Sequence, residues 1–207
     1  KGKRMKMKFI GLVGTNSTRS TNRELLQFMK NYFVNEAEIE IVEIKELPLF
    51  NKPENTELPN VVKEIAGKIE QADGVIISTP EYDHAVPASL INALNWLSYG
   101  IFPFVDKPVM ITGASYGTLG SSRAQAHLRQ ILDSPELKAR IMPSSEFLLG
   151  HSLQAFDEQG RLIDEEQVAK LRELFKDFLL FVTITSQLQH AHQANKREAE
   201  SFSWETI

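Results

Sequence analysis

The sequence contains no cysteine among its 207 residues. That absence excludes disulfide bonds, thiolate-bound metal ions and a cysteine nucleophile, and it is compatible with a reducing compartment, so we expect a cytoplasmic protein. No apolar run reaches the length that a membrane-spanning helix needs. The net charge of −4 provides no basic footprint for nucleic acid. We therefore expect neither a membrane nor a nucleic-acid partner.

The remaining composition, with 42% hydrophobic and 24% charged residues, is that of an ordinary globular protein. The length suits one α/β domain, which we place at residues 8–185. The basic stretch 1–7 is predicted to be a disordered leader or an expression remnant, because no apolar signal segment of sufficient length follows it. Residues 186–207 turn polar and lose periodicity, which predicts a polar tail or an oligomer arm. The pair His190 and His192 lacks an acidic or sulfur partner there, so no metal site is predicted.

Strand-like and helix-like segments alternate along the chain. Short apolar runs, which are typical of strands buried on both faces of a parallel sheet, lie at 9–14, 74–78 and 108–112. Alternating residues predict a strand nearer an edge at 38–44, and a fifth strand is predicted at 140–147, extended through 149. Helical spacing marks 22–33, 61–69, 87–97, 121–132 and a final helix capped by Asp164. This order predicts an α/β fold with a doubly wound, five-stranded parallel sheet and helices on both faces.

Ligands of such sheets bind outside the carboxyl ends of the strands, where this chain has three distinctive loops. The first loop is rich in hydroxyl groups and opens a helix, whose N-terminal N–H groups favour a phosphate. It matches neither the Walker A loop nor the glycine-rich dinucleotide motif, so a phosphate monoester held without metal fits better. The alternative is a polar turn with a Ser or Thr helix cap. The candidate phosphate ligands are Thr15, Ser17, Arg19, Ser20, Thr21 and Asn22.

The second loop places a tyrosine between two prolines, a rigid way to present a flat apolar face and backbone amides. Its candidate residues are Pro80, Glu81, Tyr82 and Asp83. The third loop is rich in glycine and hydroxyl groups and leads into the helix at 121–132. Its candidate residues are Ser115, Tyr116, Gly117, Thr118 and Gly120.

These segments resemble the NADPH-dependent FMN reductase family, relatives of flavodoxin that include quinone, azo-dye and chromate reductases. The resemblance covers roughly residues 8–150, and its strength lies in the order of the motifs after the first, third and fourth strands. The third loop and the Arg-Ala-Gln-x-x-Leu-Arg helix at 123–129 also look similar. Other matching residues are Gly14, Ser20, Asn22, Pro80, Glu81, Tyr82, Pro87, Leu90, Asn92, Ala93, Leu94 and Trp96.

The resemblance implies a flavodoxin-like fold and an FMN-containing oxidoreductase. Its first loop would hold the FMN phosphate, and its second and third loops would hold the isoalloxazine ring. Hydride would pass from NADPH (or NADH) through the flavin to a small acceptor such as a quinone, an azo compound, free flavin or a metal oxyanion. No acid–base side chain is required, so no catalytic residue is named. The resemblance also implies a homodimer, or a tetramer, with FMN near the interface.

Two departures from the family pattern keep other functions open. Ser17 stands where the family usually has Arg, and Arg19 offers a substitute charge. Asp83 replaces the usual Asn. It lies near the flavin, faces away from the ring, or caps the following helix. Glu81 is interpreted as a surface or interface group. One alternative is a flavodoxin-type electron carrier or an FMN-binding protein without a substrate of its own. Another is a binding or regulatory protein that kept the fold but lost FMN.

The predicted helix at 87–97 carries an apolar stripe wider than one core contact needs. Ile91 stands where the family often has a polar Lys, and residues 99–104 extend the apolar region. Large apolar patches on a globular protein usually mark an interaction site, which favours a two-fold dimer. The alternative is that these side chains wrap a deep core of the chain itself or form the floor of the acceptor pocket.

Overall fold

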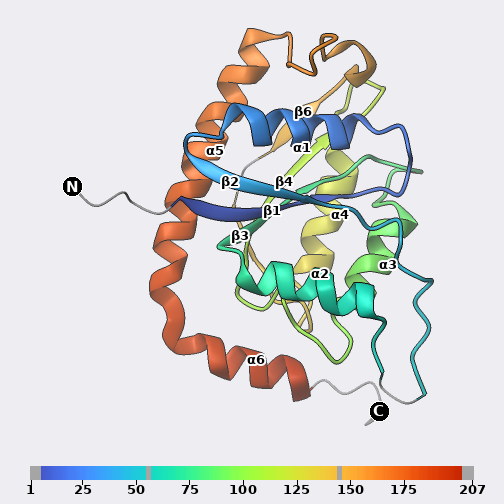
Figure 1. Cartoon of the computed structure of the whole chain (residues 1–207), viewed down its shortest axis with the longest axis vertical. Coiled ribbons are helices and arrows are strands. Elements are labelled where there is room, and N and C mark those ends of the chain that lie inside the picture. The colour runs from blue at the N-terminus through green and yellow to red at the C-terminus, as the bar shows by residue number, and fades with distance from the viewer. Residues whose placement is uncertain (1–5, 55–56, 144–145, 202–207) are drawn as a thin grey trace.

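Strands and helices alternate in the computed structural model, which describes residues 6–54, 57–143 and 146–201 (Figure 1). The first five residues of the predicted leader lie outside the described residues, whereas Met7 already belongs to the first strand. The strands are β1 (Met7–Val13), β2 (Ala37–Val42), β3 (Gly74–Ser78), β4 (Pro108–Ala114), β5 (Arg140–Ile141) and β6 (Phe147–Leu149). The α-helices are α1 (Thr21–Tyr32), α2 (Asn60–Gln71), α3 (Ala88–Trp96), α4 (Ser122–Leu132), α5 (Glu165–Thr185) and α6 (His192–Ser201). Two short 3-10 helices are η1 (Ser152–Gln154) and η2 (Ser186–Ala191).

The strands form one parallel sheet in the order β2-β1-β3-β4-β5. Within it, β1 pairs with both β2 and β3, so that Leu12 lies between Val42 and Ile77. This is the doubly wound order of flavodoxin-like folds, and it confirms the predicted α/β fold class. Because the strands are parallel, the loops that follow β1, β3 and β4 lie at one edge of the sheet, and the chain reverses its direction of winding beside β1.

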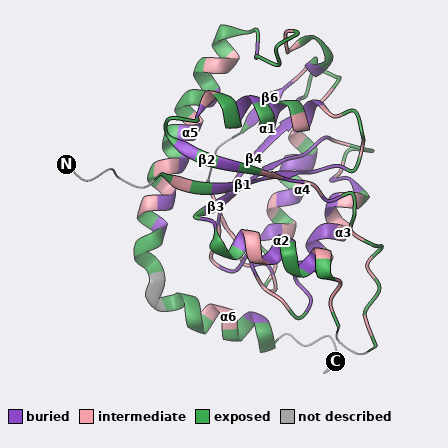
Figure 2. Cartoon of the chain, in the orientation of Figure 1, coloured by how far each residue is buried: buried purple, intermediate pink, exposed green. Residues whose placement is uncertain are grey.

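Both faces of the sheet are covered, and successive residues of a strand contribute to opposite cores. Phe9 and Val13 of β1 pack with α1 and α5, whereas Ile10 and Leu12 pack with α2, α3 and α4. In Figure 1, α1 and α2 accordingly lie on opposite sides of the strands. The strands are buried over most of their length in Figure 2, as expected for a parallel sheet sandwiched between helices.

The predicted continuous fifth strand at 140–147 is wrong, because the structure splits it in two. Arg140 of β5 pairs with Pro108 at the start of β4, and Phe147 of β6 pairs with Thr112 near its end. Pro143 interrupts the segment between them. Proline has no backbone N–H to donate to a ladder, so a strand ends or bulges where it occurs. The two short strands together occupy the fifth position of the sheet.

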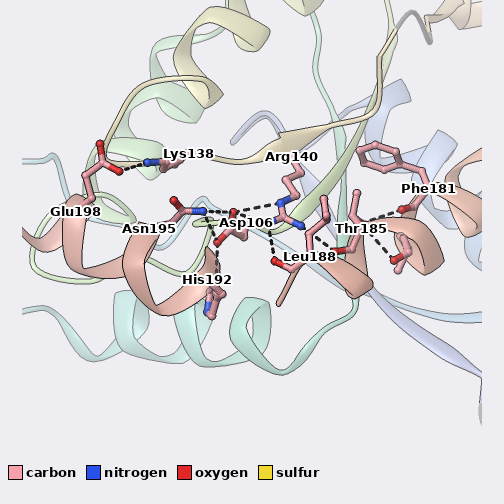
Figure 3. A network of polar contacts seen from close by, with 10 residues as sticks. Asp106, Lys138, Arg140, Phe181, Thr185, Leu188, His192, Asn195 and Glu198 are labelled. Atoms are coloured by element: carbon pink, nitrogen blue, oxygen red, sulfur yellow. Dashed lines mark hydrogen bonds and ion pairs between the residues drawn. The ribbon is translucent and has the colours of Figure 1, made fainter. Parts of the chain in front are cut away.

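The segment after α5, expected to be a polar tail or an oligomer arm, continues as η2 and α6 and lies back against the domain. Its attachment is polar and converges on Asp106 (Figure 3). The Asp106 carboxylate contacts His192 Nδ1 at 3.0 Å, accepts two hydrogen bonds from Asn195 Nδ2 at 2.9 and 3.1 Å, and pairs with Arg140 at 2.9 Å. The side chain of His190, the other half of the histidine pair, lies outside the described residues.

The charge of Asp106 favours this attachment. Burial alone would raise the pKa of Asp106, but the hydrogen bonds from Asn195 and His192, together with the charge of Arg140, lower it below its ordinary value. A carboxyl group with a lowered native pKa stabilises the folded state above its unfolded-state pKa. That contribution is lost as the pH falls through the native pKa. The contacts of α6 with the Asp106 carboxylate therefore weaken as the pH falls through the native pKa of Asp106.

Candidate functional site

The three loops enclose a cavity of about 500 Å³ at the carboxyl ends of β1, β3 and β4. This volume lies within the range of small-molecule sites. Every residue predicted for the site lines the cavity except Gly120. The sequence-based prediction missed four residues of the lining: Ala114 and Leu119, which directly flank predicted segments, and the titratable or charged His84 and Arg123. Extending each predicted segment by one residue at its ends would have found three of these four.

Hydroxyl groups of the first loop hold the loop in shape. Ser17 Oγ donates to Arg19 O at 2.8 Å, and Thr15 Oγ1 accepts the N–H of Ser17 at 3.2 Å. Ser20 is the N-cap of α1, and its Oγ accepts the N–H of Arg23 at 3.2 Å. The N–H groups of a helix's first turn have no partner within the helix. Thr21 and Asn22, in that first turn, line the cavity and therefore offer it backbone donors.

Two side chains predicted as phosphate ligands have buried protein partners. Thr21 Oγ1 lies 2.8 Å from Ser152 Oγ, 131 residues away in the sequence. Asn22 Nδ2 donates to Ala114 O at 2.9 Å, while its Oδ1 accepts from Ala114 N at 2.9 Å and from Ser78 Oγ at 2.8 Å. Asn22 thus joins α1 to the ends of β3 and β4. Both residues can still offer a ligand their backbone N–H groups while these bonds are kept.

The two arginines of the first loop differ in their surroundings. Arg23 forms an ion pair with Glu43 and donates to the carbonyl oxygens of Ser17, at 3.0 Å, and Thr18, at 3.3 Å. The hydrogen bond to Glu43 raises the pKa of Arg23 despite partial burial. Arg19 is exposed at the cavity, and its guanidinium forms no hydrogen bond or ion pair within the described residues. Arg23 therefore shapes the loop, and Arg19 is the cation available to an anionic ligand.

The second loop makes a tight turn at its tip. The backbones of Tyr82 and Ala85 exchange hydrogen bonds of 3.1 and 2.9 Å, and Asp83 and His84 between them have φ angles of 50° and 63°. Positive φ at both central residues is the signature of a type I′ turn. The predicted capping of the next helix by Asp83 is wrong, because α3 begins five residues later with Pro87 as its N-cap. Asp83 is instead exposed at the turn, at the edge of the cavity.

Tyr82 forms part of the cavity wall between the first and second loops. Its hydroxyl lies 3.2 Å from Thr15 Oγ1, while 48% of the residue remains exposed. Its ring is therefore held at one end by a hydrogen bond and is open along its length. A flat, fixed aromatic surface of this kind suits contact with a planar ligand.

Glu81 was interpreted as a surface or interface group, but its side chain is only 8% exposed. Its carboxylate accepts the backbone N–H groups of Arg123 and Ala124, at 3.0 and 3.3 Å, and pairs with the Arg123 guanidinium. Burial raises the pKa of Glu81, but these hydrogen bonds outweigh burial and lower it below its ordinary value. Glu81 therefore acts as an N-terminal cap for α4 and fastens the second loop to the third.

Backbone hydrogen bonds fix the third loop to the end of β6. Ser115 N donates to Leu149 O at 2.9 Å, and His151 N donates to Gly117 O at 2.9 Å. Gly120, predicted to bind cofactor, does not line the cavity. It has a φ of +56°, and a Cβ there would lie 2.5 Å from the carbonyl carbon of Leu148. Its role is to allow α4 to pass close to β6.

Comparison with known proteins identifies the family. The model for the NADPH-dependent FMN reductase family matches residues 7–154. The chain belongs to this family. It is 54% identical to the NADH:(hydroxy)cinnamate reductase subunit CrdA of Vibrio ruber, over 97% of this chain and 98% of the relative. It is 42% identical to the NADH-dependent flavin reductase subunit 2 of Lactobacillus johnsonii, over 85% of this chain and 97% of the relative.

A solved structure agrees with this assignment. The flavoenzyme NAD(P)H:(acceptor) oxidoreductase FerB of Paracoccus denitrificans superimposes with a TM-score of 0.78 and 25% identity, over 86% of this chain and 98% of that one. This FMN reductase family member is thus an NAD(P)H-dependent flavin or quinone reductase, with FMN and NAD(P)H as the family's cofactors. The resemblance drawn from the loop motifs is confirmed. No helix within the described residues is long and apolar enough to cross a membrane.

Proposed function

We propose that this reductase binds FMN in the cavity between its three loops and uses NAD(P)H to reduce a small acceptor. The observation that carries the proposal is the combination of donors and aromatic surface around one cavity. The first-turn N–H groups of α1 and the exposed Arg19 suit the phosphate. The segments Pro80–Asp83 and Ser115–Thr118 suit the planar ring.

The residues present fit this cofactor. No carboxylate belongs to the hydroxyl-rich first loop, which therefore presents a phosphate with donors and one cation. Ser17, where the family usually has Arg, uses its hydroxyl to fold the loop. Asp83, where the family usually has Asn, is exposed at the turn tip, so water screens its charge. Neither departure removes a group that the cavity needs.

FMN, when bound, supplies the two-electron chemistry that links a nicotinamide to the acceptor. The protein's part is to bind the cofactor and to orient it toward the nicotinamide and the acceptor. Tyr82 is fixed by its contact with Thr15, and the third loop is fixed by its bonds to β6, so both walls are ordered before a ligand arrives. Asp83 and His84 receive no catalytic assignment, because neither side chain is held in place by a hydrogen bond within the described residues.

The central test is the purified protein loaded with FMN. It is expected to bind flavin and to oxidise NADH or NADPH in steady state with a soluble benzoquinone and no second protein. Tyr82→Ala is expected to weaken FMN binding about tenfold, or ~1.4 kcal/mol, measured by flavin fluorescence titration. Tyr82→Phe keeps the ring and loses only the hydroxyl contact, so its affinity for FMN is expected to be close to that of the native protein.

Each alternative function has its own outcome in this test. A protein that binds FMN but oxidises nicotinamide only with an added redox protein would be an electron carrier of the flavodoxin type. A protein that binds no flavin would be a binding or regulatory protein of the same fold. Native FMN affinity in Tyr82→Ala would remove Tyr82 from the ring site.

We propose further that the protein works as an assembly. The apolar stripe expected to form the interface does not support this, because Leu90, Leu94, Trp96 and Leu97 are buried in the chain's own core. Support comes instead from the mouth of the cavity, where Tyr82, Tyr116 and Leu119 are 48%, 59% and 51% exposed. Two relatives also carry the word subunit in their names. The assembly is a homodimer, or a tetramer, with the cavity near the contact.

Sedimentation velocity at micromolar concentration tests this assembly. The native protein is expected to sediment as a dimer or larger species, and the double variant Tyr116→Ser, Leu119→Ser is expected to shift toward the monomer. Leu180→Ser, at a residue 58% exposed on α5 and remote in sequence from the loops, serves as the matched control. A native monomer with full FMN occupancy and full activity would exclude an assembly as the working form.

A further inference from the structure

We call the cavity between the three loops the flavin cavity. A second cavity, of about 400 Å³, shares Thr118 with it. We call it the side cavity. It lies between the third loop, the segment that follows β6, and the beginning of α5. Its volume is again that of a small-molecule site rather than of a packing defect. Besides Thr118, the residues important here are His151, Gln154, Ile163, Asp164 and Gln167.

Only a thin wall separates the two cavities. His151 has a φ of 48° and donates its N–H to Gly117 O, and a Cβ added at Gly150 would lie 2.6 Å from Thr118 O. The backbone of 150–151 therefore lies directly against the backbone of 117–118. Gly117 and Thr118 line the flavin cavity, and Thr118 lines both. A dinucleotide that occupied both cavities would have to cross the third loop at Thr118.

The polar groups of the side cavity are incompletely used by the fold. Gln167 Oε1 is buried and accepts no hydrogen bond within the described residues, and no hydrogen bond there holds its amide in one orientation. Asp164 caps α5, and both N–H groups that it caps, at 2.9 and 3.3 Å, bond to the same oxygen, Oδ1. Its other oxygen accepts no hydrogen bond within the described residues. A buried amide oxygen without a partner is costly, so this amide gains from a ligand that hydrogen-bonds it.

The charge of the side cavity selects among ligands. Among the described residues, no lysine or arginine lines it, and Asp164 is its one carboxylate. A phosphate dianion is disfavoured beside this carboxylate when no cation is at hand. A neutral sugar hydroxyl suits a free carboxylate oxygen, the pairing by which nucleotide-binding proteins recognise the ribose 2′-hydroxyl of NADH rather than the 2′-phosphate of NADPH. Ile163, 58% exposed, adds an apolar surface for a base.

We propose that the side cavity binds the adenosine half of the nicotinamide dinucleotide and that Asp164 makes the protein prefer NADH over NADPH. This inference rests on the proposed function, because it requires the nicotinamide to react in the neighbouring flavin cavity. The amides of Gln154 and Gln167 hydrogen-bond the adenosine, and the Asp164 carboxylate accepts from its 2′-hydroxyl.

The decisive variant is Asp164→Asn, assayed as the FMN-loaded protein with each nucleotide. Asparagine caps helices as well as aspartate does, so α5 stays intact while the charge is removed. The ratio of kcat/KM for NADH to that for NADPH is expected to fall about tenfold, or ~1.4 kcal/mol. Asp157→Asn is the matched control, because Asp157 also caps two N–H groups through one oxygen but lies outside the side cavity. The NADH to NADPH ratio of kcat/KM in Asp157→Asn is expected to equal that of the native protein.

A binding measurement gives a readout independent of turnover. Adenosine is expected to bind the FMN-loaded native protein in calorimetry, and adenosine 2′-monophosphate is expected to bind at least tenfold more weakly. The ratio of these two affinities is expected to become smaller in Asp164→Asn. Loaded protein that oxidises neither nucleotide would overturn the proposed function. Loaded protein that oxidises both, with the same nucleotide ratio in Asp164→Asn as in the native protein, would overturn this inference alone. Equal binding of adenosine and adenosine 2′-monophosphate would also overturn it.

Discussion

Alanine at position 120 is expected to lower the free energy of unfolding by about 3 kcal/mol and to weaken FMN binding. Two costs add. Gly120 has a φ of +56°, which is unfavourable for any residue with a Cβ, and the new Cβ would lie 2.5 to 2.7 Å from backbone atoms of Leu148 and Leu149. Backbone atoms cannot rotate away as a side chain can, so β6 must shift. Because Ser115 N donates to Leu149 O, the third loop moves with it.

Gly100→Ala separates the two costs. Gly100 has a φ of +66°, but a Cβ there would meet nothing within 4 Å. It therefore carries the conformational cost alone, and we expect a loss of about 1 kcal/mol. Urea denaturation measures both variants, and fluorescence titration measures their affinity for FMN. Equal losses in the two variants would show that close packing against β6 is not what requires glycine at position 120.

Asn22→Ala is expected to be the most damaging single change, lowering the free energy of unfolding by about 4 kcal/mol. The side chain satisfies the N–H and the carbonyl of Ala114 and the hydroxyl of Ser78, all buried. Removing it leaves these groups without a partner, at about 1 to 3 kcal/mol each before relaxation. For a domain of this size, such a loss lowers the Tm by roughly 8 to 16 °C. FMN affinity is expected to fall as well, because α1 loses its tie to β3 and β4.

Asn31→Ala is the matched control on the same helix. Asn31 is exposed, and its side chain accepts one hydrogen bond from Gln27. We expect its effect on stability to stay within about 0.5 kcal/mol. Thermal denaturation without FMN distinguishes the two roles of Asn22. A native Tm in Asn22→Ala, combined with lost flavin binding, would mean that Asn22 contacts the cofactor and does not hold the scaffold.

Local patterns were sufficient to predict the layers of this fold. The buried runs of β1, β3 and β4 and the apolar faces of the helices each have a period that can be read within a few residues. The Asp164 cap of α5 was equally local, since its partners are two and three residues away. The positions of the three loops then followed from the rule that parallel strands end at one edge.

Long-range contacts explain what the sequence could not predict. The scaffold role of the Asn22 side chain was not predicted because its partner Ala114 is 92 residues away. Glu81 looked like a surface residue because its partner Arg123 lies 42 residues away, in α4. The docking of α6 was not predicted because it uses polar contacts with Asp106 rather than an apolar stripe. Gly120 was assigned to the cofactor because its close approach to β6 is visible only in three dimensions.

The interrupted fifth strand also bears on solubility. An exposed sheet edge offers unpaired N–H and carbonyl groups on which a second molecule can add a strand, the first step toward aggregation. Here one edge consists of β5 and β6, with two and three residues, and Pro143 lies between them. At the other edge, β2 presents Glu38 and Glu40 to solvent. Another chain therefore finds little continuous edge to extend, because one edge is short and broken by a proline and the other carries two exposed glutamates.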